Sequence, residues 1–174
     1  EVNGGITVTD QDLAENVVLT YYATTVNELI AALGDSDLSI INLDSSEYDL
    51  SSIIHNVNGS KTLKSDISST VYLNIDQDIS SISSEDYVTM TTLVNGDIEI
   101  DTNKNLNFNT IIQGMLTLSD GELNLNGKEL NIESDLQHTG GYLTIGGGNL
   151  NVEGDYLLDS VGETGYSAGF LQMI

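Results

Sequence analysis

Short stretches of similar sequence recur along the second half of this chain, and this repetition restricts the fold more than any other feature. Residues 121–132 resemble residues 96–108, and residues 114–130 align with residues 141–157. A fixed period of about 25 residues is typical of a solenoid, in which each repeat buries its apolar face only against its neighbours. We therefore expect stacked coils rather than a globular α/β domain.

Apolar residues alternate with polar ones over short segments, both before and within the repeats. Such alternation predicts strands that turn two side chains inward and end at Gly, Asn or Asp. Before the repeats, strands are expected at residues 38–43, 48–50, 53–54, 61–64, 69–75 and 88–94. The inward residues expected in the repeats are Ile98/Ile100, Leu106/Phe108, Ile111/Ile112, Leu116/Leu118, Leu123/Leu125, Leu130/Ile132, Leu136, Leu143/Ile145, Leu150/Val152 and Leu157. Three or four such strands per turn predict coils of about 25 residues, and about five or six coils.

The N-terminal part contains the one convincing helix signal. Residues 6–8 and 17–22 are expected to be strands from their β-branched and aromatic content. Residues 25–28 read Thr-Val-Asn-Glu, a capping box, and Gly34 is expected to end the helix in a left-handed conformation. A helix of about two turns is unstable alone, so we expect it to cover the open first coil.

The chain is accordingly divided into N-terminal strands and a capping helix in residues 1–37 and β-helix coils in residues 38–174. The last repeat ends without a polar cap. Because an uncapped coil would expose an apolar edge, we expect the coils to continue beyond Ile174.

Two parts of the sequence resemble known families. Residues 25–33, followed by Leu-Ser-Ile-Ile-Asn-Leu at 38–43 and Tyr-Asp-Leu at 48–50, resemble the start of right-handed parallel β-helix proteins of the pectate-lyase-like superfamily. Residues 123–132, with the later segments 154–158 and 165–173, resemble repeats of very large adhesin-like surface proteins of Gram-positive anaerobes. The resemblance implies an all-β, right-handed parallel β-helix.

The charge of the chain restricts its partners. Four lysines stand against 27 acidic residues, and the net charge is −23. Nucleic acid is excluded as a partner because phosphate binding needs clustered Lys or Arg, and an anionic membrane surface is disfavoured for the same reason. Neutral glycans, cations and basic protein surfaces remain. The chain has no apolar run long enough to span a membrane and no signal peptide, and we expect no membrane insertion.

Catalysis is not expected. The enzymes of the resembled superfamily are polysaccharide lyases and hydrolases, and the lyases use a cation with an Arg or Lys base, whereas this chain has no Arg. A hydrolase needs two carboxylates at a defined separation. Asp76 and Asp78 have the spacing that puts two side chains on one strand face, which is also the pattern of an ordinary solvent-facing strand. We therefore predict that the chain is not an enzyme.

Calcium is the one cofactor that the residues suggest. Asp97, Glu99 and Asp101 alternate on one expected outer face, and carboxylate oxygens are ligands of Ca²⁺. The adjacent acidic pair Glu85 and Asp86 lies in an expected loop. No EF-hand loop is present, so these residues are a weak calcium candidate set.

Histidines and tyrosines give no clear site. His55 and His138 have no second His or Cys at ligand spacing, so a transition-metal site is not predicted. Five tyrosines could form a glycan-stacking surface or could be half-buried coil positions: Tyr21, Tyr22, Tyr142, Tyr156 and Tyr166.

These observations predict a non-catalytic structural or adhesive β-solenoid segment of a large secreted or cell-surface bacterial protein, contacting glycans or proteins along one face. A self-assembling filament subunit that stacks through its coil ends is the first alternative. A carbohydrate-active β-helix enzyme module is the second.

Overall fold

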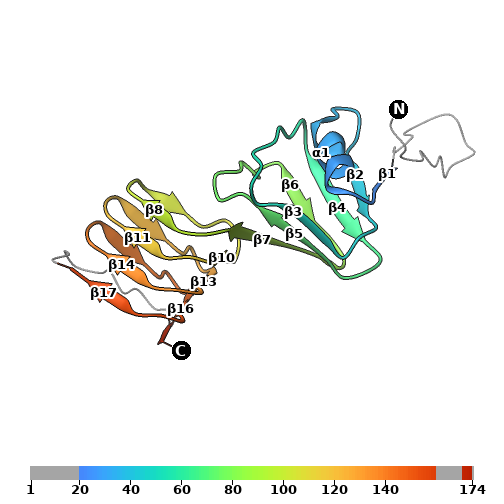
Figure 1. The fold of residues 1–174 in the computed structure, drawn as a ribbon. Coiled ribbons are helices and arrows are strands. Elements are labelled where there is room, and N and C mark those ends of the chain that lie inside the picture. Colours follow the sequence, from blue (N-terminus) through green and yellow to red (C-terminus); the bar gives the residue numbers. More distant parts are fainter. Residues whose placement is uncertain (1–19, 160–169, 174) are drawn as a thin grey trace, which may run out of the picture. The chain divides into compact units, whose positions relative to one another are not determined.

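The chain is mostly β and forms a parallel β-solenoid of about seven turns. The computed structural model describes residues 20–159 and 170–173 (Figure 1), and the strand expected at residues 6–8 lies outside them. Every strand pair in the described residues is parallel. The predicted fold class is therefore confirmed. The chain divides into two compact units, Glu1–Met90 and Thr91–Ile174.

The first unit contains one helix and six complete strands. They are β1 (Thr20–Ala23), α1 (Val26–Gly34), β2 (Ile40–Leu43), β3 (Glu47–Leu50), β4 (Lys61–Ser65), β5 (Ser69–Leu73) and β6 (Ile82–Ser84). Strands β1, β2, β4 and β6 form one sheet in that order, and β3 pairs with β5. The sequence separation of paired residues changes from one strand pair to the next, from about 20 to about 23 residues. Coils of the first unit therefore differ in length.

The helix begins as predicted and ends differently. The Thr25 Oγ1 accepts from the Glu28 amide at 3.3 Å, and the Glu28 Oε2 accepts from the Thr25 amide at 3.1 Å, so the capping box is confirmed. Gly34 is the last helical residue rather than a left-handed stop, which corrects that prediction. Asp35 is the C-cap, with extended φ −85° and ψ 117°. The Lys61 Nζ donates to the carbonyls of Asp35 and Leu38 just after the helix, so a side chain from the next coil satisfies this turn.

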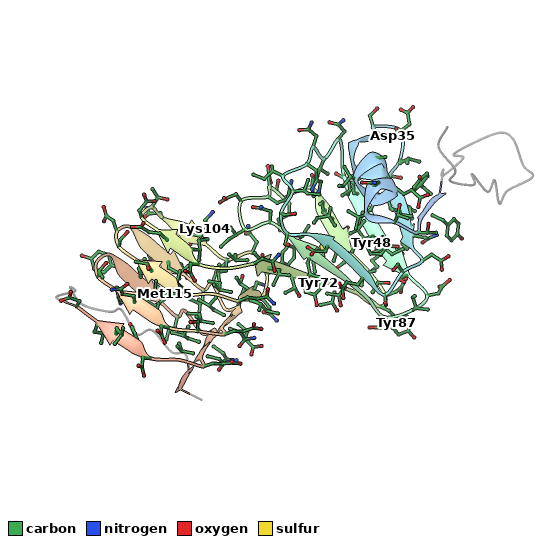
Figure 2. The ribbon with its side chains drawn as sticks, viewed as in Figure 1. Asp35, Tyr48, Tyr72, Tyr87, Lys104 and Met115 are labelled. Carbon is green, nitrogen blue, oxygen red and sulfur yellow. The ribbon has the colours of Figure 1, made fainter. Side chains whose placement is uncertain are left out.

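Helix α1 packs against the first coil, as its length requires. It contacts β1, β2 and β3 through a buried face that includes Leu29 and Leu33. Tyr48 of β3 is fully buried, and its hydroxyl donates to the Ala23 carbonyl at 2.5 Å (Figure 2).

Three sheets enclose the second unit. Strand β7 (Val88–Val94) begins in the first unit and ends in the second. The strands that follow are β8 (Ile98–Ile100), β9 (Lys104–Asn105), β10 (Thr110–Ile112), β11 (Leu116–Leu118), β12 (Glu122–Asn124), β13 (Glu129–Ile132), β14 (Leu136–His138), β15 (Tyr142–Thr144), β16 (Asn149–Val152), β17 (Tyr156–Leu158) and β18 (Phe170–Met173). One side is β8-β11-β14-β17, the second is β9-β12-β15, and the third runs from the end of β7 through β10, β13 and β16 to β18.

Coils of the second unit are shorter than the sequence comparison predicted. Leu116 pairs with Leu136 and Leu136 with Tyr156, so these coils have about 20 residues each, and the preceding coil, from Ile98 to Leu116, is slightly shorter. The predicted length of about 25 residues and the predicted five or six coils are therefore wrong.

The cause of this error is the similarity of the three sides. Successive sides of one coil carry the same short apolar pattern. The alignments of residues 121–132 with 96–108 and of residues 141–157 with 114–130 therefore each join one side to the next side of the following coil.

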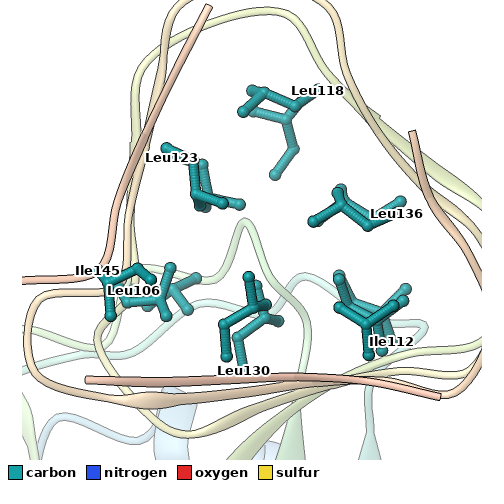
Figure 3. Packing of buried hydrophobic residues seen from close by; sticks show 14 residues of the cluster. Leu106, Ile112, Leu118, Leu123, Leu130, Leu136 and Ile145 are labelled. Carbon is teal, nitrogen blue, oxygen red and sulfur yellow. The ribbon is translucent and has the colours of Figure 1, made fainter. Parts of the chain in front are cut away.

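Aliphatic side chains fill the interior of the second unit. Figure 3 shows Leu118, Leu123, Leu130 and Leu136 directed into the space that the three sides enclose, and all four are at most 1% exposed. Leu123 pairs with Leu143, which is equally buried, so like residues stack on like residues. This stacking excludes water along the axis of the unit and supplies most of its hydrophobic stabilisation.

Five apolar residues lie elsewhere than predicted. Phe108 is half-buried and does not belong to the aliphatic core. Ile111 faces outward, because Thr110 and Ile112 are the inward residues of β10. Leu157 is 48% exposed, because Tyr156 occupies the position equivalent to Leu136. Ile53 and Ile54 form no strand and are exposed.

Glycine is required at the turn before β12 and β15. Gly121 and Gly141 have φ of +69° and +70°, a conformation that disfavours other residues. A Cβ on Gly121 would also lie 2.4 Å from the backbone carbon of Thr102 in the preceding coil. These glycines therefore permit close stacking of the turns.

Candidate functional site

The carboxylates proposed for calcium lie in β8 or next to its ends. Asp97, Glu99 and Asp101 are all exposed, and Glu99 and Asp101 flank inward Ile100. The Asp97 Oδ1 accepts from the Met115 amide at 2.8 Å. The Glu99 Oε1 accepts from the Ser119 hydroxyl at 2.6 Å. Two of the three carboxylates are thus already bonded to the following coil.

No metal-ligand cluster forms in residues 20–159 and 170–173, where no three His, Cys, Asp or Glu side chains are placed to hold an ion. Calcium binding at this face therefore stays a prediction. The acidic pair predicted in a loop does something different: the Glu85 Oε2 accepts from the Lys64 Nζ at 2.7 Å, and Asp86 adopts a positive φ of 55°. Glu85 thus belongs to a surface ion pair.

Polar side chains of the second unit bond from coil to coil along its outer faces. The Asp135 Oδ1 accepts from the Asp155 amide at 2.8 Å, the same arrangement as at Asp97. On the next side, the Thr144 hydroxyl donates to the Glu122 Oε1 at 2.7 Å. The outward side chains are therefore structural in part, because they fix each coil on the one before it.

A shallow hollow lies on the third side of this unit. It has a volume of about 140 Å³ and is lined by Ile111, Asn131, Asn151 and the exposed carboxylates of Glu133 and Glu153. The Asn151 Nδ2 donates to the Asn131 Oδ1 at 2.6 Å. Both amides are thus bonded to one another, and the hollow is too small for a drug-sized ligand.

A larger hollow lies in the first unit, beside the carboxylate pair Asp76 and Asp78. Asp76 and Asp78 belong to the turn after β5 and not to a strand, so the prediction that they share a strand face is wrong. They line a hollow of about 330 Å³ together with His55, Gln77 and the apolar Ile54. This volume is at the lower end of the range of small-molecule sites.

His55 is the most unusual residue of this hollow. Its side chain is 8% exposed, and neither ring nitrogen makes a hydrogen bond. Burial lowers the pKa of the imidazole, and the nearby Ile53 carbonyl partly offsets that effect. The ring is therefore kept neutral at pH 7.

The backbone of His55 is held by one side chain of the next coil. The Gln77 Oε1 accepts from the His55 amide at 2.8 Å, and the Gln77 Nε2 donates to the His55 carbonyl at 2.9 Å. Gln77 therefore takes the place of a strand neighbour where the backbone itself forms no ladder.

Asp78 is fixed by the turn that it begins. Its Oδ1 accepts from the Ser80 amide at 3.0 Å. Hydrogen bonds from the Ser80 backbone and side chain lower the pKa of this carboxyl, so it is ionised at neutral pH. The mouth of the hollow thus carries a fixed negative charge.

The second histidine belongs to the core of the other unit. His138 is fully buried at an inward position of β14, where it pairs with Leu118 in the strand register. Its Nδ1 lies 3.1 Å from the Tyr156 Oη, and its Nε2 lies 3.3 Å from the Gly141 carbonyl. Both ring nitrogens are thus satisfied, which distinguishes this histidine from His55.

Within the described residues, the tyrosines differ in exposure and do not support the glycan-stacking alternative. Tyr21 is buried and Tyr22 is exposed, on opposite faces of β1. Tyr142 is exposed, Tyr156 is half-buried beside His138, and Tyr166 lies outside the described residues.

Sequence reasoning missed the pairing of His55 with Gln77. The two residues are 22 residues apart, which equals the offset from β2 to β4, so the correct coil length could have indicated the contact. The helical structure in residues 20–159 and 170–173 is not long and apolar enough to cross a membrane. Comparisons of this chain with protein-family models, with curated proteins and with solved structures find no match.

Proposed function

We propose that the chain is a non-catalytic structural and adhesive segment of a large secreted or cell-surface bacterial protein. The observation that carries the proposal is the regular stacking of the second unit, where coils of about 20 residues repeat in one register. Such stacking produces a stiff spacer with long faces on which glycans or proteins can be held. The pectate-lyase-like and adhesin-like resemblances of the sequence agree with this role.

Hydrogen bonds that side chains form with successive coils support a mechanical role. The pairs Asp135 with Asp155 and Glu122 with Thr144 join neighbouring coils outside the core. Tension along the chain must break these bonds and the parallel ladder together. The net charge of −23 keeps such a surface soluble and favours basic partners.

Mechanical unfolding tests the structural part of the proposal. The full chain, held between two marker domains, is pulled by atomic force microscopy. A coil of about 20 residues should release about 65–70 Å of chain, from the extended length of each residue. We expect force peaks at this spacing as coils unwind one after another. Extension without peaks would contradict a solenoid that resists tension.

The non-catalytic part needs a separate assay. The chain is incubated with neutral and uronate polysaccharides, and new reducing ends and unsaturated products are measured. We expect none above the level of heat-denatured protein. Product formation that Asp76→Asn or Asp78→Asn abolishes would instead establish the carbohydrate-active alternative at the first-unit hollow.

A further inference from the structure

The hollow beside His55 has a lining of one electrostatic character. Asp76 and Asp78 are acidic, the other polar residues that line it are uncharged, and no Lys or Arg contributes. Ile54 and Val57 add apolar surface at the same hollow. An anion would meet two carboxylates here, so the lining favours a cation that carries an apolar stem.

The buried imidazole is the second and independent observation. A polar group that is buried without a hydrogen-bond partner costs free energy, so the ring of His55 favours any ligand that bonds to it. Each ring nitrogen exposes less than 1 Å². A hydrogen bond from a ligand therefore requires the ring to turn toward the hollow that His55 lines. Gln77 holds the backbone in place during such a turn, through two hydrogen bonds to His55.

We propose that this hollow binds an alkylammonium group, supplied either by a free small amine or by a lysine side chain of a partner protein. An ammonium has three donors and no acceptor, whereas carboxylates only accept and a neutral imidazole has one accepting nitrogen. Asp76 and Asp78 would meet the charge at the mouth, His55 would accept one hydrogen bond, and Ile54 and Val57 would contact the stem. This site does not depend on the proposed scaffold role.

A bare metal ion fits the same residues less well. Within the part of the chain that the structure describes, no three His, Cys, Asp or Glu side chains are arranged as ligands. An ammonium needs hydrogen-bond acceptors rather than a closed coordination sphere, and two carboxylates with one imidazole provide them.

Nuclear magnetic resonance of the two histidines tests the proposal on the full chain. The probe is n-butylamine hydrochloride at constant pH and ionic strength, and n-butanol is the neutral control of the same length. We expect the amine to shift the ring signals of His55 in a saturable way while those of His138, whose nitrogens are both bonded, stay unchanged. Equal shifts with butanol, or equal shifts at His138, would overturn the proposal.

Matched variants separate the site from the general negative charge. Asp78→Asn and Asp76→Asn each remove one charge at the hollow, and Asp66→Asn removes one exposed charge from a residue that does not line it. We expect the two hollow variants to bind butylamine about tenfold more weakly, from the loss of a charge-assisted bond, and the control to bind as the parent does. Circular dichroism confirms that each variant is folded. Equal weakening in all three would assign binding to net charge and overturn the proposal.

Two further probes identify the source of the ammonium. Nα-acetyl-lysine amide presents a lysine side chain as a protein does, and its Nε-acetylated form lacks the charge. Binding of the lysine amide with the affinity of butylamine supports a lysine of a partner protein, whereas binding of butylamine alone supports a free amine. Equal binding of the Nε-acetylated form would contradict recognition of an ammonium.

Discussion

Both units consist of stacked coils, but their interiors differ. In the second unit, five strand pairs share an offset of 20 residues and place Leu on Leu or Ile on Val, and the core is almost wholly aliphatic. In the first unit, coil length varies from one strand pair to the next, and the interior includes Lys61, His55 and Gln77. A coil length that repeats permits an interior of interchangeable apolar layers, whereas a coil length that changes at every strand pair leaves gaps in the backbone ladder that individual polar side chains fill.

The largest expected effect on stability is in the second unit. Leu123→Asp places an unpaired charge between apolar layers, and we expect the second unit to unfold, with a loss of several kcal/mol. Asn124→Asp is the matched control, because this neighbour on β12 faces outward and an Asp keeps the oxygen that accepts from the Asn126 amide. Thermal melting followed by circular dichroism measures both. If Leu123→Asp melted like the parent, Leu123 would not be an inward residue.

In the first unit, we expect the largest loss of stability from changing a buried polar residue. Lys61→Met leaves the Asp35 and Leu38 carbonyls without their donor, and we expect a loss of about 2–4 kcal/mol. Lys64→Met on the same strand removes only the partly exposed ion pair with Glu85, so we expect a much smaller loss. Urea denaturation gives both values. Equal losses would show that the buried position of Lys61 is unimportant.

Acidification should reveal the buried imidazole of His55. Because burial lowers the pKa of folded His55, the unfolded chain takes up its proton first. Stability from this group is therefore complete above the unfolded value of about 6.5 and is lost as pH falls below it, by at most about 1.4 kcal/mol per pH unit. We expect the parent to lose more stability than His55→Gln between pH 7.5 and 5.5 in urea denaturation. A parallel pH dependence in the two proteins would contradict a lowered pKa of His55 in the folded chain.

The smallest expected effect concerns the N-terminal cap of helix α1. Thr25→Ala removes the acceptor for the Glu28 amide and should cost about 1 kcal/mol. Thr25→Ser keeps the hydroxyl and serves as the control. Both are compared with the parent by thermal melting, and an unchanged melting temperature in Thr25→Ala would mean that packing of α1 on the first coil dominates its stability.

Much of the second unit could be predicted from sequence, because the alternation of apolar and polar residues identifies the inward ones directly. Leu116, Leu123 and Leu130 are buried as expected. Coil length is harder to predict. Every side of a coil carries a similar pattern, so an alignment that joins one side to the next side of the following coil also matches. Gly121 with Gly141 gives the true period, since both occupy the same positive-φ turn in successive coils.

The hollow of the first unit was beyond sequence reasoning for a different reason. The spacing of Asp76 and Asp78 indicates a carboxylate pair, but their turn is fixed by hydrogen bonds to Asn74 and Ser80 that no periodic pattern indicates. His55 has no second His or Cys at the spacing of metal ligands, so the sequence does not mark it. Its character comes from burial beneath a neighbouring coil, which only the structure places there.

Constant register in the second unit also limits how its length can change. Removing one residue from a strand would turn every following inward leucine of that strand to the outside. Removing residues 121–140 would instead join Asp120 to Gly141, which occupies the same turn position as Gly121. The genetic unit of growth or loss in this part of the molecule is therefore a block of about 60 nucleotides, which encodes one whole coil. Shorter insertions can persist only at the corners between sides.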